Sequence, residues 1–160
     1  MIEQVRQKLT QEVEQLNHEL NVLLPEALKK ALAQGDLREN GDYHAALERQ
    51  QFVHARLSHL RSRLAKLSQI DLSKIPRDKI GLGSRVDVQD AETKEKETYE
   101  LVIPDAMDMD AGHISVASPL GRALLDHKPG QTVTARLPAA TRKLKILKVA
   151  TLHQQVGEDA

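Results

Sequence analysis

The sequence predicts an α+β protein in which an antiparallel α-helical coiled-coil hairpin precedes a small antiparallel β-sheet domain with one helix. Apolar residues recur every three or four positions through the first 70 residues, which is the period of a helix. From residue 84 onward they alternate with polar residues, which is the period of a strand. A segment rich in Pro, Gly and charge separates the two patterns. We therefore expect two domains, at residues 1–75 and 76–153, and a disordered tail at 154–160.

The first helical stripe begins at the N-terminus. Its apolar positions are three or four apart, with Glu, Asn and His in the gaps, which is typical of an amphipathic helix. The stripe consists of Ile2, Val5, Leu9, Val13, Leu16, Leu20, Leu23 and Ala27. Pro25 lies inside it. Because proline lacks a backbone N–H and disfavours helical backbone at the preceding residue, we expect a kink or a short break there.

The second stripe is more regular and forms the other arm. It consists of Tyr43, Ala46, Gln50, Val53, Leu57, Leu60, Leu64 and Leu67. Two stripes of similar length, joined by a short segment that contains glycine, indicate an antiparallel helical hairpin. At about 1.5 Å per residue, arms of roughly 30 residues reach about 45 Å.

The segment that joins the arms holds two candidate turn points. Gly35 suits the position just after a helix end, and the pair Asn40-Gly41 tolerates left-handed backbone. The sequence alone does not choose the helix ends between them.

The same segment carries three carboxylates, at Asp36, Glu39 and Asp42, which gives the tip at residues 35–43 an acidic character. One interpretation is a capping box, with Asp36 as the N-cap of the second arm and Glu39 reaching back to it. The other is a set of hard oxygen ligands for Mg²⁺, completed by a partner because three carboxylates are too few to hold the ion alone.

Five short segments after the linker have strand character, and together they predict a small twisted antiparallel sheet. They lie at residues 84–89, 98–103, 112–117, 131–137 and 144–149. One helix interrupts them, because Ser118 is a favourable N-cap and Pro119 suits the first helical position.

The composition excludes several classes of function. The 23 basic residues are matched by 23 acidic ones, which argues against a protein that grips duplex DNA by bulk charge. Aromatic residues make up 2% of the chain, too few for a base-stacking platform or an aromatic pocket. Without cysteine there is no disulfide, thiolate metal site or thiol nucleophile. No apolar run approaches about 18 residues, so we expect a cytoplasmic protein that does not contact membranes.

Two motifs resemble a known family. Residues 35–46 (GDLRENGDYHAA) resemble the tip motif of the bacterial Gre transcript cleavage factors, the GreA/GreB family, and residues 118–125 (SPLGRALL) resemble that family's C-terminal signature. The resemblance extends over nearly the whole chain, from residue 1 to residue 151. The signature positions are Ser118, Pro119, Leu120, Gly121 and Arg122.

The resemblance implies a transcription elongation factor whose hairpin enters the secondary channel of RNA polymerase after backtracking. Asp36 and Glu39 would hold Mg²⁺ jointly with the polymerase, whose active site then hydrolyses the nascent RNA near its 3′ end. The isolated chain would bind no cofactor, lack enzymatic activity and be a monomer. An FKBP-like C-terminal domain would dock at the rim of the channel. Further tip contacts to polymerase or RNA are expected from Leu37, Arg38, Asn40, Asp42 and Tyr43.

The chain departs from the family pattern at Gly41-Asp42, where the family usually has Ala-Glu. Glycine costs about 1 kcal/mol relative to alanine in an exposed helix, so we expect the start of the second arm to be frayed or displaced. An altered tip also leaves an alternative function open, that of a Gre-like protein which occupies the channel and inhibits or modulates the polymerase without cleavage.

Basic residues gather along the second arm, at Arg49, Arg56, Arg61, Arg63 and Lys66. In the family such a basic side attracts RNA. A run of charge on the flank of a coiled coil is otherwise simply solvated.

Overall fold

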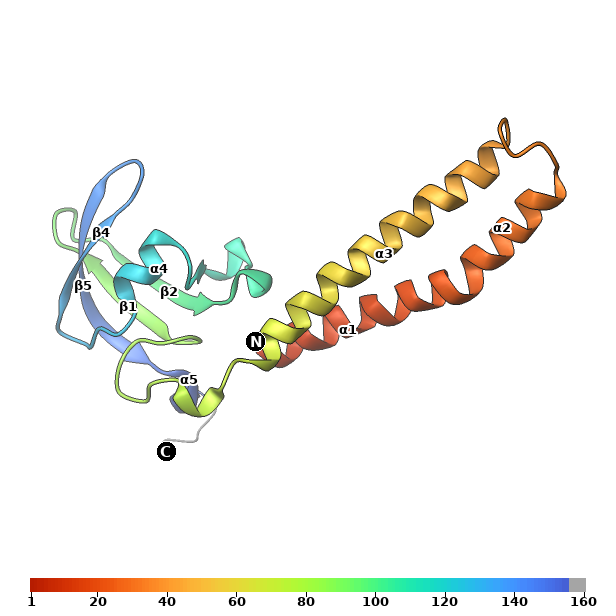
Figure 1. Cartoon of the computed structure of the whole chain (residues 1–160). Helices are drawn as coiled ribbons and strands as arrows, with labels where there is room; N and C mark the ends of the chain where they lie inside the picture. Colours follow the sequence, from red (N-terminus) through yellow and green to blue (C-terminus); the bar gives the residue numbers. More distant parts are fainter. Residues whose placement is uncertain (156–160) are drawn as a thin grey trace. The chain divides into compact units, whose positions relative to one another are not determined.

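The computed structural model describes residues 1–155, which form two compact units (Figure 1). One unit extends from Glu3 to Ile70 and is a helical hairpin, and the other consists mainly of the residues from Asp71 onward and contains a β-sheet. The predicted α+β class is confirmed. Residues 71–75, which we expected to end the hairpin domain, belong to the sheet unit.

In the hairpin unit, three consecutive helical segments form the first arm and one long helix forms the second (Figure 1). The first arm consists of α1 (Ile2–His18), the π-helical turn η1 (Glu19–Leu23) and α2 (Leu24–Ala33), and the second arm is α3 (Gly41–Ser68). The arms pack through buried apolar side chains at the predicted spacing. These are Val5, Leu9, Leu16, Leu24 and Ala31 from the first arm and Ala46, Val53, Leu57, Leu60 and Leu67 from the second.

The first arm accommodates Pro25 by widening one helical turn rather than by breaking. The Leu24 N–H donates to the carbonyl of Glu19, five residues back, where an α-helix would use the residue four back. This wider turn suits Pro25, whose ring crowds the preceding turn. The additional residue also shifts the apolar stripe, so that Leu24 is buried while Leu23 is 51% exposed. The predicted stripe is therefore wrong at Leu23 and Ala27, both of which are exposed.

Two bidentate ion pairs join the arms. Arg49 donates two hydrogen bonds to the carboxylate of Glu19 at 2.5 and 2.8 Å, and Arg56 donates two to Glu12 at 2.8 and 3.1 Å. These hydrogen bonds lower the pKa of both glutamates and raise the pKa of both arginines. Because the paired groups come from opposite arms and the fork geometry is specific, the ion pairs favour one register of the hairpin.

Acidification is expected to weaken the hairpin below the ordinary glutamate pKa of 4.5. Since the folded state lowers the pKa of Glu12 and Glu19, their contribution to stability is complete above 4.5 and is lost as the pH falls through the lower folded values. Partial exposure and screening by salt keep the effect small. The melting temperature should fall less on acidification in the Glu12→Gln/Glu19→Gln variant than in the wild type. Identical pH profiles for the two proteins would contradict this prediction.

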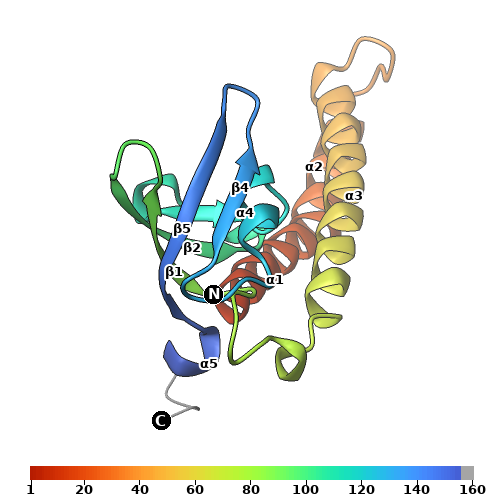
Figure 2. The ribbon, with the colours of Figure 1, turned by 90° about the vertical axis from the view of Figure 1, so that its left-hand side faces the viewer.

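Within the described residues, five strands form one sheet in the order β3-β2-β1-β5-β4, and Figure 2 shows β1, β5 and β4 side by side. Their bounds are β1 Arg85–Asp90, β2 Lys96–Val102, β3 His113–Ser115, β4 Thr132–Arg136 and β5 Thr141–Ala150. β2 and β3 pair in parallel, so the prediction of a wholly antiparallel sheet is wrong at this pair. The cause is the intervening segment, whose short helices η3 (Pro104–Ala106) and η4 (Met109–Ala111) replace a tight hairpin turn.

The core of the sheet unit lies between the inner face of the sheet and α4 (Pro119–Leu124). Its fully enclosed side chains come from four strands, from α4 and from the segment before β1. They are Ile80, Val86, Val88, Leu101, Leu124, Val133, Leu144 and Ile146. This packing fixes which face of each strand points to solvent.

A second short helix, α5 (Leu152–Gln155), ends the described chain and was not predicted. Its side chains bind the residues that precede β1: the imidazole of His153 hydrogen-bonds the Ile75 carbonyl at 3.0 Å, and the Gln155 amide donates to the Gly83 carbonyl at 2.8 Å. The predicted disordered tail at 154–160 is therefore wrong at residues 154 and 155. Residues 156–160 lie outside the described part of the chain.

Candidate functional site

The tip of the hairpin presents its three carboxylates around one hollow. α2 ends at Ala33 and Gly35 follows with φ +89°, so of the two candidate turn points Gly35 is the one with left-handed backbone at the end of the first arm. The loop then returns to α3 and borders an open polar hollow of about 330 Å³. Its lining consists of Gln34, Asp36, Glu39, Asn40, Gly41 and Asp42.

Asn40, and not Asp36, caps the second arm. The Asn40 Oδ1 accepts a hydrogen bond from the Tyr43 N–H at 3.1 Å, and α3 begins at the next residue, Gly41. Asp36 instead accepts from the Arg38 N–H at 3.2 Å, which forms a local turn inside the loop. The predicted capping box is therefore wrong, and so is the predicted fraying, because the helix is regular from Gly41.

The Asn40 side chain also ties the loop to the first arm. Its Nδ2 donates to the carbonyl of Ala31, near the end of α2, at 2.6 Å. The residue is only 9% exposed, and both ends of its amide are used. Asn40 thus shapes the loop, whereas Leu37, Arg38 and Asp42 are exposed and Tyr43 is half-buried.

His44 supports the loop as well, and sequence reasoning did not single it out. Its Nε2 hydrogen-bonds the carbonyl of Arg38 at 3.1 Å, and its ring meets the Tyr43 ring edge-on with centroids 5.8 Å apart. Arg38 lies in the sequence between Asp36 and Glu39, the two expected Mg²⁺ ligands. The hydrogen bond from His44 therefore restrains the backbone that carries these two carboxylates. The signal in the sequence is the position of His44 in the first turn of the helix that Asn40 caps.

The tip carboxylates have oxygen atoms available for a cation. Within residues 1–155, Glu39 and Asp42 have neither a hydrogen-bond nor an ion-pair partner, and Asp36 uses one oxygen for the Arg38 N–H. Exposed carboxylate oxygens are the donors that Mg²⁺ prefers, so the residues fit such an ion chemically. No group of three or more potential ligands in the described chain is arranged to hold a metal ion. A partner would have to complete the coordination.

Replacing Asn40 by alanine is expected to destabilise the hairpin by about 2 kcal/mol, because the cap and the bond to Ala31 are lost together. The measurement is the free energy of unfolding from urea titration. Asp42→Ala is the matched control, since Asp42 lies two residues away without a partner and should change the value by less than about 0.5 kcal/mol. An unchanged free energy for Asn40→Ala would show that the bonds of Asn40 do not hold the loop.

The C-terminal signature builds the turn between β3 and α4. Ser118 is the N-cap of α4, as predicted: its Oγ accepts from the Gly121 N–H at 3.0 Å and donates to the Ser115 carbonyl at 2.6 Å. Arg122 donates from Nε to the Ala117 carbonyl at 2.8 Å. Pro119 lies in the first turn, and Leu120 packs against the core. These contacts give the signature a structural role inside its own unit.

The basic side of the second arm is largely engaged within the protein. Arg49 and Arg56 are neutralised by Glu19 and Glu12, and Arg61 hydrogen-bonds the Asn17 side chain at 3.4 Å. Arg63 also has an interaction partner. The attraction of RNA by these arginines stays a prediction. In the structure, Arg49 and Arg56 form ion pairs that join the two arms of the hairpin.

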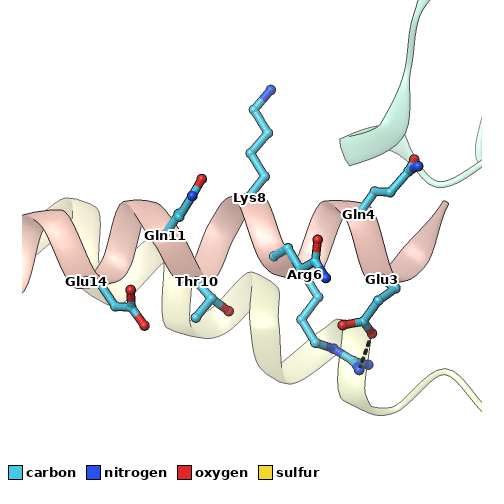
Figure 3. A pocket seen from close by; sticks show the side chains of 8 residues that line it. Glu3, Gln4, Arg6, Lys8, Thr10, Gln11 and Glu14 are labelled. Atoms are coloured by element: carbon cyan, nitrogen blue, oxygen red, sulfur yellow. Dashed lines mark hydrogen bonds and ion pairs between the residues drawn. The ribbon is translucent and has the colours of Figure 1, made fainter.

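The outer face of α1 has a second hollow, lined by polar and charged side chains (Figure 3). Every lining residue is exposed, and acids, cations and amides are mixed, with Glu3 and Arg6 paired at 3.0 Å. Such a surface is typical of a solvated helix face. None of the helices in residues 1–155 combines the length and apolar character needed to cross a membrane.

Comparison with known proteins gives matches over almost the full length. The family described as "Transcription elongation factor, N-terminal" matches residues 1–68, and "Transcription elongation factor, GreA/GreB, C-term" matches residues 75–151. Transcription elongation factor GreA of Thermodesulfovibrio yellowstonii is 38% identical over 144 residues, covering 90% of this chain and 91% of the relative. GreA of Hyphomonas neptunium is 39% identical over 123 residues, covering 77% and 78%. The solved structure of GreA factor homolog 1 of Thermus thermophilus is 25% identical with a TM-score of 0.42, covering 90% of this chain and 93% of that one.

Proposed function

Because the chain belongs to the GreA/GreB family of transcription elongation factors, we propose that it stimulates cleavage of backtracked nascent RNA in the active site of RNA polymerase. The observation that supports this most directly is the acidic hollow at the end of the hairpin, where carboxylates with available oxygens are displayed to solvent. A protein that lends ligands to another enzyme needs such groups at an exposed end, and it needs no substrate pocket of its own.

The proposed route to the active site is the secondary channel of the polymerase. The 28 residues of α3 span about 42 Å at 1.5 Å per residue. Interlocked leucines and the pairs Arg49–Glu19 and Arg56–Glu12 stiffen this length. The hairpin can therefore carry its tip a long distance as one rigid element.

In the proposed mechanism, Asp36 and Glu39 hold Mg²⁺ jointly with the polymerase, and Asp42 lies at the edge of the same hollow. A bound Mg²⁺ supplies charge that stabilises the reacting oxygens in phosphodiester hydrolysis. The chain contributes position: the Arg38 N–H orients Asp36, while Asn40 and His44 fix the backbone on either side of Glu39. Carboxylates held in place before the encounter need less reorganisation during the reaction. The isolated chain would bind no metal and cleave no RNA.

The remaining parts of the proposal rest on the family likeness. The sheet unit would dock at the outer rim of the channel, Leu37, Arg38 and Tyr43 would contact polymerase or the nascent RNA, and the factor would act as a cytoplasmic monomer.

A stalled and backtracked elongation complex tests the proposed function. With Mg²⁺ present, addition of the protein should shorten the RNA from its 3′ end, and the protein mixed with RNA alone should leave the RNA intact. Binding with slowed nucleotide addition and no shortening would overturn the proposal in favour of a channel-occupying inhibitor. Failure to bind the polymerase would exclude both functions.

A further inference from the structure

The loop at the end of the hairpin contains an asparagine that is followed directly by glycine. Of the three asparagines in the sequence, at positions 17, 21 and 40, only Asn40 has this neighbour. Glycine has no Cβ, so its backbone nitrogen can approach the preceding side chain without steric hindrance. In an Asn-Gly pair this nitrogen is placed to attack Cγ of the asparagine and close a five-membered ring, an intramolecular reaction that proximity favours.

The backbone nitrogen of Gly41 is available for this attack. Gly41 is exposed and is the first residue of α3, so its N–H has no acceptor within the helix. It donates no other hydrogen bond in residues 1–155. A Cβ at this position would meet no atom within 4 Å. The attacking nitrogen is therefore neither bonded to an acceptor nor shielded by neighbouring atoms.

The carbon that would be attacked is activated by the helix cap. The Tyr43 N–H donates to the Oδ1 of Asn40 at 3.1 Å. When a nucleophile adds to Cγ, negative charge develops on this oxygen, and a backbone N–H that points at it stabilises the charge as an oxyanion hole does in acyl transfer. The cap thus holds the side chain and also favours addition to its Cγ.

One hydrogen bond opposes the reaction. The Nδ2 of Asn40 donates to the Ala31 carbonyl at 2.6 Å, which fixes the orientation of the amide, so this bond has to open before the ring closes. The loop residues 32–39 are all exposed, and His44 restrains them through the carbonyl of Arg38. Exposed loops open locally at low free energy. The rate in the folded protein is therefore controlled by opening of the loop.

We propose that Asn40 is a site of spontaneous deamidation. The Gly41 nitrogen adds to Cγ and gives its proton to solvent, while Nδ2 takes up a proton and leaves as ammonia, so that a succinimide ring remains. Water then opens the ring at either of its two carbonyl groups, which yields aspartate or isoaspartate at position 40. No electrons are transferred, and the only co-reactant is water.

Both products alter the hollow at the tip. Aspartate adds a fourth carboxylate to its lining, and an ionised carboxylate cannot donate a hydrogen bond to the Ala31 carbonyl. Isoaspartate inserts a methylene group into the main chain before Gly41, at the point where α3 begins. The loss of RNA cleavage that we expect from the modified protein rests on the proposed function, whereas the deamidation itself does not.

The test incubates the full chain at mildly alkaline pH, digests it with trypsin and analyses the fragments by mass spectrometry. Cleavage after Arg38 and Arg49 releases residues 39–49, in which Asn40 is the only side-chain amide. This fragment should gain mass with time, as OH replaces NH₂, and should separate into two products of equal mass. Residues 9–29 contain Asn17 and Asn21, neither of which precedes glycine, and should gain none from these residues over the same period.

Two variants test the route of the reaction. Gly41→Ala should lower the rate at least about 10-fold, in the folded protein and in urea alike, because a Cβ hinders the attack. The measurement in urea separates this hindrance from any change in stability. His44→Ala removes the restraint on the Arg38 carbonyl, so it should raise the rate in the folded protein and leave the rate in urea unchanged.

Three outcomes would overturn the proposal. A mass gain in residues 39–49 no larger than that in residues 9–29 would mean that the folded tip does not react. Equal rates in urea for the wild type and Gly41→Ala would mean that the Gly41 nitrogen is not the nucleophile. Equal rates for the folded wild type and His44→Ala would mean that loop opening does not control the reaction. Because the assay contains no polymerase, its result is independent of the transcript cleavage assay.

Discussion

Asp36→Ala/Glu39→Ala is expected to lower the stimulated cleavage of backtracked RNA by about 100-fold or more, while binding to the polymerase is retained. In the proposed mechanism these carboxylates would hold the Mg²⁺ whose charge stabilises the reacting oxygens. Removal of one group that stabilises a transition state typically costs about 10² to 10³ in rate. Neither residue caps a helix, since Asn40 performs that role, and both side chains are exposed. The free energy of unfolding should therefore change by no more than about 0.5 kcal/mol.

RNA shortening is measured over a range of protein concentrations. For each variant this gives the maximal cleavage rate and the protein concentration at half of that rate. A loss of maximal rate at an unchanged half-saturating concentration is expected. Glu26→Ala/Glu48→Ala is the matched control, because it removes two exposed acids from the same hairpin away from the tip. Full cleavage by Asp36→Ala/Glu39→Ala, or an equal loss in the control, would contradict the assignment of the site.

Gly121→Ala is expected to destabilise the sheet unit by about 3 kcal/mol, the largest stability effect that the structure predicts for a single methyl group. A Cβ at this position would lie 2.1 Å from the carbonyl oxygen of Ser115, and backbone cannot rotate away as a flexible side chain can. The clash also disturbs the Ser118 cap, whose Oγ binds both Gly121 and Ser115. Small domains have about 5–15 kcal/mol of stability in total, so this loss is a large fraction.

Gly41→Ala is the control for that substitution. Both glycines lie in the first turn of a helix, but a Cβ at Gly41 would meet nothing within 4 Å. Alanine there should be neutral or should stabilise the hairpin by up to about 1 kcal/mol. Denaturant unfolding of the two variants measures both values, and similar free energies would show that crowding at Ser115 is not the reason for glycine at position 121.

The sequence predicted the parts of the fold that a local period encodes. The apolar seam of the second arm was predicted correctly because its spacing of three or four residues is kept from Tyr43 to Leu67, and Leu57 and Leu60 are fully buried as expected. The first arm was predicted only as far as Leu20. The widened turn at Glu19–Leu23 changes the phase of the stripe that follows it, and the three-or-four spacing of the apolar residues did not predict this change.

The remaining differences arise where distant residues decide between local alternatives. Asp36 and Asn40 are both favourable N-cap residues. The structure uses Asn40, whose side chain also hydrogen-bonds the carbonyl of Ala31, nine residues away. The parallel pairing of β3 depends on the path of residues 103–112, which has no period. α5 is too short for a helical stripe and is positioned by the contacts of His153 and Gln155. The exposed tip carboxylates were predicted from a motif, and their role in catalysis stays a prediction.

The π-helical turn at Glu19–Leu23 makes the exact residue count of the first arm matter. Each residue of an α-helix advances the chain by about 100° around the axis, and the widened turn absorbs one residue without that advance. Deleting a single residue from this turn would restore regular α-helical geometry and leave α2 in its present phase. If the turn became regular α-helix with all its residues kept, α2 would instead rotate by about 100° about its own axis. Leu24 and Ala31 would then leave the seam, and the carbonyl of Ala31 would turn away from Asn40. The direction in which the hairpin aims its carboxylates is thus set by angular phase as well as by length.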